Sequence, residues 1–299
     1  MNPPAGAPVN MVVDSTWQWT FGLLHFGLAA LTIVVAARGP VRERNWTELR
    51  FRMLVLFGGA LGAVFFEGAI DRGGQLWYAD INAWHLMTLY GVKVPLWVMP
   101  VYLWFLGGGA LFIIQKIRNG ARPKDFIQIF ALITVADFAL EIPLIKMAGL
   151  YQYWGDSQPF FNHRWCPLPL WYVTTNRWFD LLPAMIILLL MSTRIRHIEW
   201  AIPVVMVASC YVTYGSVTWP VIAALQNHWS ETTTWICGGV TMVLGLGATY
   251  IGAHLAPRLR HAMDWYGKEK GLSLGAALRA QNTVDADEPA VPSLASTTA

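Results

Sequence analysis

The sequence predicts an all-α polytopic membrane protein, a helix bundle with about seven transmembrane helices. Of its 299 residues, 55% are hydrophobic and only 13% are charged, about half the charged fraction of an ordinary soluble domain. Apolar runs close to 20 residues recur along the chain, and a run of that length crosses a bilayer as a helix. We therefore expect a multi-pass protein of the cell membrane.

The seven expected spans follow one another with short connections. They cover residues 17–37, 53–71, 95–115, 126–148, 169–193, 200–224 and 235–256. The short connections indicate one membrane domain, residues 17–265, after an extracytoplasmic segment 1–16. A composition rich in Ala, Ser, Thr and Pro predicts that residues 266–299 form a cytoplasmic, largely disordered tail.

The basic residues predict the orientation of the bundle. Sixteen of the 21 Lys and Arg residues fall on one side of the alternating spans. They are Arg38, Arg42, Arg44, Arg50, Arg52, Lys116, Arg118, Arg122, Lys124, Arg194, Arg196, Arg258, Arg260, Lys268, Lys270 and Arg279. The positive-inside rule makes that side cytoplasmic, with the N-terminus outside and the C-terminus inside. The net charge of +3 thus reflects topology. We expect the lipid bilayer and an apolar small molecule as partners, and no nucleic acid.

Five carboxylates lie within the expected spans, where ionisable side chains are expensive and usually face a bundle interior or a water-filled cavity. They are Glu67, Asp71, Asp137, Glu141 and Asp180. Two pairs have i,i+4 spacing, so each pair shares one helix face. Because a helix rises about 1.5 Å per residue, Glu67, Glu141 and Asp180 each lie about 20 Å from the cytoplasmic ends of their spans. The sequence therefore predicts an acidic cavity in the outer half of the bilayer.

Several polar residues near that level have both a functional and a structural interpretation. His25 and Tyr214 reach a similar depth, but each could simply join helices by hydrogen bonds. Asp71 and Asp180 could pair with basic residues, Arg72 and Arg177, at the rim of the cavity.

Two aromatic segments, residues 77–85 and 149–177, are expected to cover the cavity as lids or interfacial segments. The second contains Tyr151, Tyr153 and Trp154. Aromatic faces stabilise cations, which suits a reaction that passes through a carbocation or oxocarbenium ion. An interfacial aromatic belt explains the same composition.

Several known membrane chemistries lack their sequence signatures here. The seventh span has no Lys for a retinal Schiff base, the seven His residues form no desaturase-type box, and paired DxxxD motifs are missing. The three Cys residues give no CxxC spacing, and the sequence has neither GxGxxG nor a P-loop. We therefore expect no metal and no cofactor, which leaves acid–base chemistry, transport or binding.

One stretch resembles the AveC-type spirocyclase family. It comprises Glu141-Ile142-Pro143, Gly149-Leu150-Tyr151-Gln152-Tyr153-Trp154-Gly155, Gln158-Pro159, Pro169-Leu170-Trp171 and Asn176. The family's pattern places Gln-Pro more directly after Tyr-Gly than this chain does. The resemblance implies a multi-pass protein of the bacterial plasma membrane that acts in polyketide biosynthesis and closes spiroketals, in one case with dehydration.

The resemblance and the residues together predict a cofactor-free, spirocyclase-like cyclase that acts on an apolar natural-product precursor. A carboxyl group in an apolar site can keep its proton near neutral pH and act as a general acid. Glu141 or Glu67 would protonate the leaving oxygen, and Asp137 or Asp180 would accept the proton of the attacking hydroxyl. The expected substrate-binding residues are Asp71, Tyr151, Tyr153, Trp154, Gln158, Asn176, Tyr214 and His25.

Two alternatives remain. A membrane-integral terpene cyclase would use the same carboxylic acids to protonate an epoxide or alkene. A proton-coupled transporter or binding protein would also place carboxylates in the membrane. The apolar inner halves of the spans, and the lack of an internal repeat, favour a one-sided pocket over a transmembrane relay.

Overall fold

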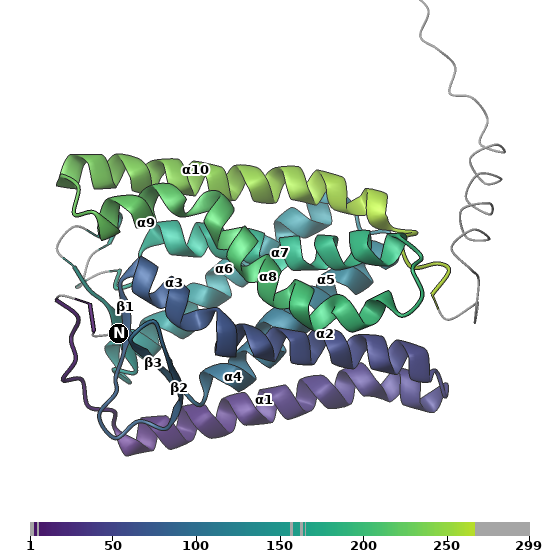
Figure 1. Cartoon of the computed structure of the whole chain (residues 1–299), viewed down its shortest axis with the longest axis horizontal. Coiled ribbons are helices and arrows are strands. Elements are labelled where there is room, and N and C mark those ends of the chain that lie inside the picture. The colour runs from purple at the N-terminus through teal and green to yellow at the C-terminus, as the bar shows by residue number, and fades with distance from the viewer. Residues whose placement is uncertain (1–2, 5, 156–157, 162–163, 165, 267–299) are drawn as a thin grey trace, which may run out of the picture.

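Long apolar helices lie side by side in the computed structural model, which describes residues 3–4, 6–155, 158–161, 164 and 166–266 (Figure 1). Within this described part, six helical stretches are long and apolar enough to cross a membrane, and a bent helix pair makes a seventh. The chain is therefore an all-α multi-pass membrane protein, as the sequence predicts. Of the predicted tail 266–299, residues 267–299 lie outside the described residues.

The predicted spans correspond to the observed helices, with ends shifted by several residues. The first two spans and the bend are α1 (Ser15–Arg42), α2 (Trp46–Phe65) and α3 (Glu67–Gly74). The third span consists of α4 (Val98–Tyr102), the π-helical turn η1 (Leu103–Gly107) and α5 (Gly108–Arg118). The fourth span is α6 (Pro123–Lys146). The fifth span is α7 (Leu170–Ser192). The sixth consists of the 3-10 helix η2 (Ile198–Ala201), α8 (Ile202–Val217) and α9 (Trp219–Gln226). The seventh consists of α10 (Glu231–Leu255) and the 3-10 helix η3 (Ala256–Leu259).

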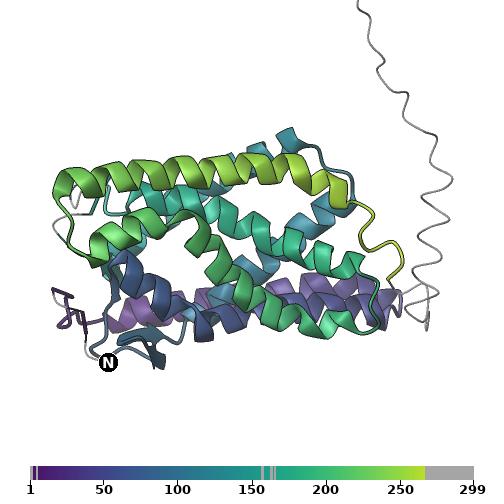
Figure 2. The same ribbon diagram turned by 45° about the horizontal axis from the view of Figure 1, so that its top comes forward.

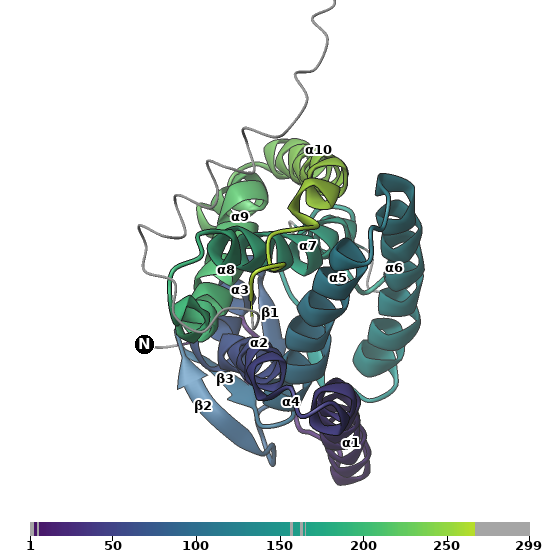
Figure 3. The same cartoon turned by 90° about the vertical axis from the view of Figure 1, so that its right-hand side faces the viewer.

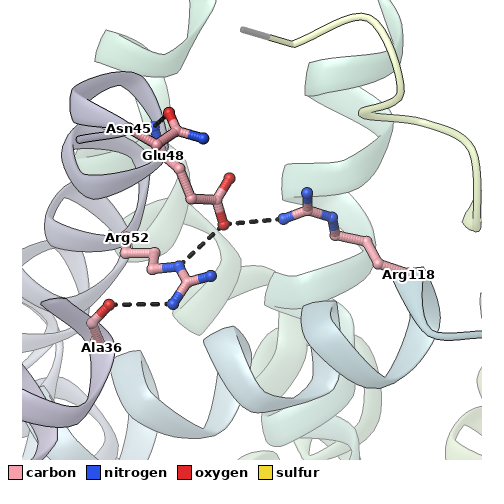
Figure 4. A network of polar contacts seen from close by, with 5 residues as sticks. All are labelled: Ala36, Asn45, Glu48, Arg52 and Arg118. Carbon is pink, nitrogen blue, oxygen red and sulfur yellow. Dashed lines mark hydrogen bonds and ion pairs between the residues drawn. The ribbon is translucent and has the colours of Figure 1, made fainter. Parts of the chain in front are cut away.

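Ion pairs join the helix ends that carry the basic loops. Glu48 on α2 accepts hydrogen bonds from Arg52 at 2.9 Å and from Arg118 on α5 at 3.0 Å, and Arg52 also donates to the Ala36 carbonyl oxygen of α1 at 3.1 Å (Figure 4). The basic loops after α1 and α5 therefore meet at one end of the bundle, as the prediction for the first and third spans requires.

Two of the predicted spans are broken, which the apolar pattern does not reveal. The predicted helix 53–71 bends by 48° where α2 passes into α3. The predicted helix 200–224 ends at Val217, and α9 begins at Trp219 with Pro220 in its first turn, a position that proline favours. Figure 2 shows α8 and α9 running in different directions.

Short strands lie in and beside the expected lid segments, at the end opposite the ion pairs (Figure 1). β1 (Leu76–Tyr78) pairs antiparallel with β4 (Tyr151–Tyr153), and β2 (His85–Leu89) forms a hairpin with β3 (Val92–Pro95). The hairpin turns at Tyr90-Gly91, where both residues have positive φ, as a tight two-residue turn requires. The sequence predicts none of these strands, because each is short and mixed in composition.

Glycines let α2 and η1 cross at close range. A Cβ atom on Gly59 would lie 2.5 Å from the Gly107 nitrogen, and one on Gly62 would lie 2.8 Å from the Tyr102 ring. Only residues without side chains permit such an approach. The crossing brings Tyr102 against α2 and toward the bend that begins α3, where the candidate site lies.

Candidate active site

A cavity of about 200 Å³ lies in the half of the bundle that carries the strands. Eight segments contribute to its wall: α1, α3, β1, the α4–η1 turn, α6, β4, α7 and α8. The described lining residues are Phe21, Leu24, His25, Leu28, Glu67, Leu76, Tyr78, Trp97, Val98, Val101, Tyr102, Trp104, Phe105, Asp137, Leu140, Glu141, Leu144, Tyr151, Tyr153, Tyr172, Asn176, Phe179 and Tyr214. The wall combines three carboxylates with tyrosine hydroxyls and apolar aromatic rings.

Glu67 is the first residue after the bend, and two tyrosines hold it. Tyr78 on β1 donates its hydroxyl hydrogen to Oε1, and Tyr102 donates to Oε2. Glu67 is buried directly after the bend at Phe66, and Gly62 of α2 makes room for the Tyr102 ring. Both oxygens of Glu67 are therefore acceptors in this arrangement.

Glu141 on α6 is held through one oxygen. Tyr151 on β4 donates to its Oε2 at 2.7 Å. Tyr151 pairs with Tyr78 of β1, and Tyr153 pairs with Leu76. Alternate residues of a strand share one face, so these four side chains lie on the same face of the small sheet. The two-stranded sheet thus presents one face of tyrosines to both glutamates.

Burial sets the protonation state of these strand tyrosines. The pKa values of Tyr78, Tyr151 and Tyr153 are raised well above the ordinary tyrosine value. Burial is the largest cause, and the charges of the neighbouring carboxylates come second. Their hydroxyls therefore keep their protons at neutral pH and remain hydrogen-bond donors.

A buried arginine connects the remaining carboxylates. Arg177 on α7 donates from Nη2 to Oδ2 of Asp137, and its Nη1 lies 3.2 Å from Oδ2 of Asp180. All three side chains are almost fully buried. Beside them, Tyr214 donates to Asn176 Oδ1 at 2.5 Å. The sequence-based expectation that Arg177 pairs with a carboxylate is confirmed, and it pairs with two.

His25 lies on α1 beside two tryptophan rings. Its imidazole is nearly parallel to Trp97 and Trp104, and the Trp104 indole N–H donates to Nδ1 at 3.2 Å. A nitrogen that accepts carries no hydrogen, so Nε2 is the N–H of the ring. Nε2 is buried and has no hydrogen-bond partner among the described residues. The cavity wall therefore includes a donor that a ligand oxygen could satisfy.

The structure brings together most of the predicted site residues. Glu67, Glu141, Asp137, Tyr151, Tyr153, Asn176, Tyr214 and His25 all line the cavity. Of the described lining residues, none is Asp71, Asp180, Trp154 or Gln158.

Those four residues lie behind the wall or serve the fold. Asp180 stands behind Arg177. Asp71 is buried one turn beyond Glu67 on α3, and its carboxylate oxygens have no hydrogen-bond partner within the described chain. Trp154 packs edge-on against Trp77. Gln158, predicted to bind substrate, instead donates to the Gly74 carbonyl at 2.6 Å and accepts from Trp171 at 3.3 Å, so it ties two chain segments together.

Sequence reasoning missed several wall residues, of which Tyr102 matters most. A hydroxyl inside an apolar span is the same signal that identified Tyr214, and it was present in the third span. Trp97, Trp104 and Phe179 carry no such signal, because an aromatic residue in a membrane helix is usually packing or an interfacial anchor.

Comparisons with known proteins give two similarities. No family model matches the chain, and no solved structure matches it. NAD(P)H-quinone oxidoreductase chain 4 1 of Microcystis aeruginosa (strain NIES-843 / IAM M-2473) is 26% identical over 164 residues, which cover 52% of this chain and 31% of that protein. NAD(P)H-quinone oxidoreductase chain 4, chloroplastic, of Cryptomeria japonica is 24% identical over 164 residues, covering 50% and 32%. The chain spans about a third of the length of these curated relatives.

Proposed function

We propose that the protein is a membrane-integral cyclase that uses carboxyl groups for acid–base catalysis on an apolar precursor, most simply in a spiroketal-type closure. The observation that carries this proposal is the convergence of Glu67 on α3 with Asp137 and Glu141 on α6 at one aromatic-walled cavity. Paired carboxyl groups in different surroundings are the usual means of dividing acid and base roles.

The hydrogen bonds favour Glu141 as the proton donor. Tyr151 occupies only its Oε2, which leaves Oε1 for a substrate oxygen. Glu67 accepts hydrogen bonds through both oxygens, and a carboxyl group bound in this way has no proton to give. Glu67 is therefore better suited to stabilise a positive charge that develops in the cavity.

The reaction conserves protons. Glu141 protonates the hydroxyl of a hemiketal, the C–O bond breaks and water leaves with that proton. The resulting oxocarbenium ion faces carboxylates and aromatic rings such as Trp97 and Phe179, which stabilise cations. A second hydroxyl then attacks the cationic carbon, its O–H bond breaks, and Asp137 accepts the proton before it returns to Glu141. General acid–base assistance of this kind typically contributes about 10²- to 10⁴-fold in rate.

The test compares metabolites from the native host by mass spectrometry in four strains: unmodified, deleted, Glu141→Gln and Glu231→Gln. Gln keeps the shape of Glu141 and can still accept from Tyr151, but it has no acidic proton. Glu231 is an exposed carboxylate at the start of α10 and serves as the matched control. We expect an acyclic precursor to accumulate in the deletion and Glu141→Gln strains only. Normal product in the Glu141→Gln strain would exclude the proposed mechanism.

The similarity to NAD(P)H-quinone oxidoreductase chain 4 supports a second candidate, a membrane subunit of a quinone-reducing enzyme. The same deletion strain tests it. Membranes from that strain would then lose NAD(P)H–quinone reductase activity, whereas a cyclase predicts unchanged reductase activity and altered metabolites.

A further inference from the structure

The wall of the cavity changes from polar to apolar between its inner and outer sides. Glu67, Tyr151 and Tyr214 line the inner side and are nearly fully buried. Leu24 on α1 and Leu140 on α6 line the same cavity, yet 46% and 54% of their surfaces are exposed. The cavity therefore reaches the outside of the bundle between these two helices.

The residues at this outer side define a slot between α1 and α6, formed by Leu24, Leu28 and Leu140. α1 packs on α2, α4 and η1, whereas α6 packs on α7, α10 and β4. Figure 3, a view along the helices, shows α1 and α6 at the edge of the bundle with α5 inside them. Leu24 is nine residues into α1, about 14 Å along a helix of about 42 Å, so the slot lies at the depth of the lipid chains.

The volume of the cavity limits what it can enclose. An engineered cavity of about 150 Å³ holds benzene, whereas sites that enclose a whole drug-sized ligand measure about 300–1,000 Å³. A cavity of about 200 Å³ accordingly holds one ring or a short segment. The remainder of any larger ligand has to extend through an opening, and the slot that opens to the outside is lined by leucines.

We propose that the substrate is a long apolar molecule that enters from the bilayer through the α1–α6 slot, with only its oxygen-bearing end inside the cavity and its chain left among the lipids. The assignment of that end as the reacting one rests on the proposed cyclase function. Leu24, Leu28 and Leu140 provide no hydrogen-bond partner for a polar chain, whereas Glu141 and the buried Nε2–H of His25 can both donate to an oxygen.

The route can be tested without knowing the substrate, with the apolar photoreactive probe 3-trifluoromethyl-3-(m-iodophenyl)diazirine in phosphatidylcholine vesicles. We expect the probe to label the inner wall, at Tyr78, Tyr151 or Tyr214, as well as lipid-facing side chains. The double substitution Leu24→Trp/Leu140→Trp should remove most of the inner-wall label. Leu140→Ala, which widens the slot, should increase it.

The matched control is Leu31→Trp/Leu132→Trp, which places the same side chains on α1 and α6 at exposed leucines outside the described cavity lining. It should leave the inner-wall label unchanged. An unlabelled inner wall in the unmodified protein, or equal labelling in both double variants, would overturn the slot. Either result is independent of the Glu141→Gln experiment, so a failure of the route can be told apart from a failure of the cyclase.

Discussion

Replacing Gly59 with alanine should force α2 and η1 apart. The new methyl group would lie 2.5 Å from the nitrogen of Gly107, 2.6 Å from its Cα and 2.8 Å from the carbonyl oxygen of Tyr102. All three are backbone atoms, so no side chain can rotate out of the way. Overpacking of this kind typically costs about 1–3 kcal/mol. If Tyr102 moves away from Glu67, a hydrogen bond to a charged group, worth about 1.5–3 kcal/mol, is lost as well.

We therefore expect Gly59→Ala to lower the free energy of unfolding by about 2.5–6 kcal/mol from these two contributions. Gly109 in α5 provides the matched control, because a methyl group there meets nothing within 4 Å. Gly109→Ala should stabilise the helix by about 0.5–1 kcal/mol, since glycine loses more backbone entropy on folding. Unfolding by sodium dodecyl sulfate in mixed micelles, followed by circular dichroism, measures both. Equal midpoints for the two variants would refute the close crossing of α2 and η1.

Two further predictions concern the buried polar groups. Arg177→Met leaves Asp137 and Asp180 without their shared partner, so it should lower the free energy of unfolding by about 3–5 kcal/mol in the same micelle assay. Asp180→Asn keeps the pair between Asp137 and Arg177 and should cost clearly less. A similar loss of stability in both variants would contradict the shared-arginine arrangement. For His25, ¹⁵N chemical shifts of the labelled ring should report a hydrogen on Nε2. Trp104→Phe should weaken the preference for this tautomer. A hydrogen on Nδ1 in the unmodified protein would exclude the hydrogen bond from Trp104.

The transmembrane spans, and the similar depth of the carboxylates within them, were predictable because they depend on composition and on helical rise. Glu67 and Glu141 lie in different spans, and counting residues from the ends of those spans is enough to place them at one height. Their partners were not predictable, because Tyr78 and Tyr102 reach Glu67 only through the bend at Phe66 and the glycine crossing. These are tertiary contacts that leave no periodic pattern in the sequence.

The small sheet illustrates the same limit. β1 and β4 are separated by more than 70 residues, and each contains only three residues. Their pairing places Tyr78 opposite Tyr151 and fixes which face meets the cavity. A sequence pattern shows that Tyr151 and Tyr153 can share a face, but it does not show which distant segment pairs with them.

The apolar packing beneath the cavity bears on the choice between a cyclase and a proton relay. Toward the basic end, the described parts of α2, α5 and α7 contribute fully buried apolar side chains: Phe51, Val55, Leu56, Ile113, Ile114, Ile117, Ile187, Leu188 and Met191. A relay needs polar groups in succession across the membrane, and these nine side chains offer none. An acid-catalysed cyclisation needs no such path, because the proton given to the leaving oxygen is recovered from the attacking hydroxyl. A cavity closed toward the basic end and open to the lipid at its side therefore suits the cyclase better than the relay.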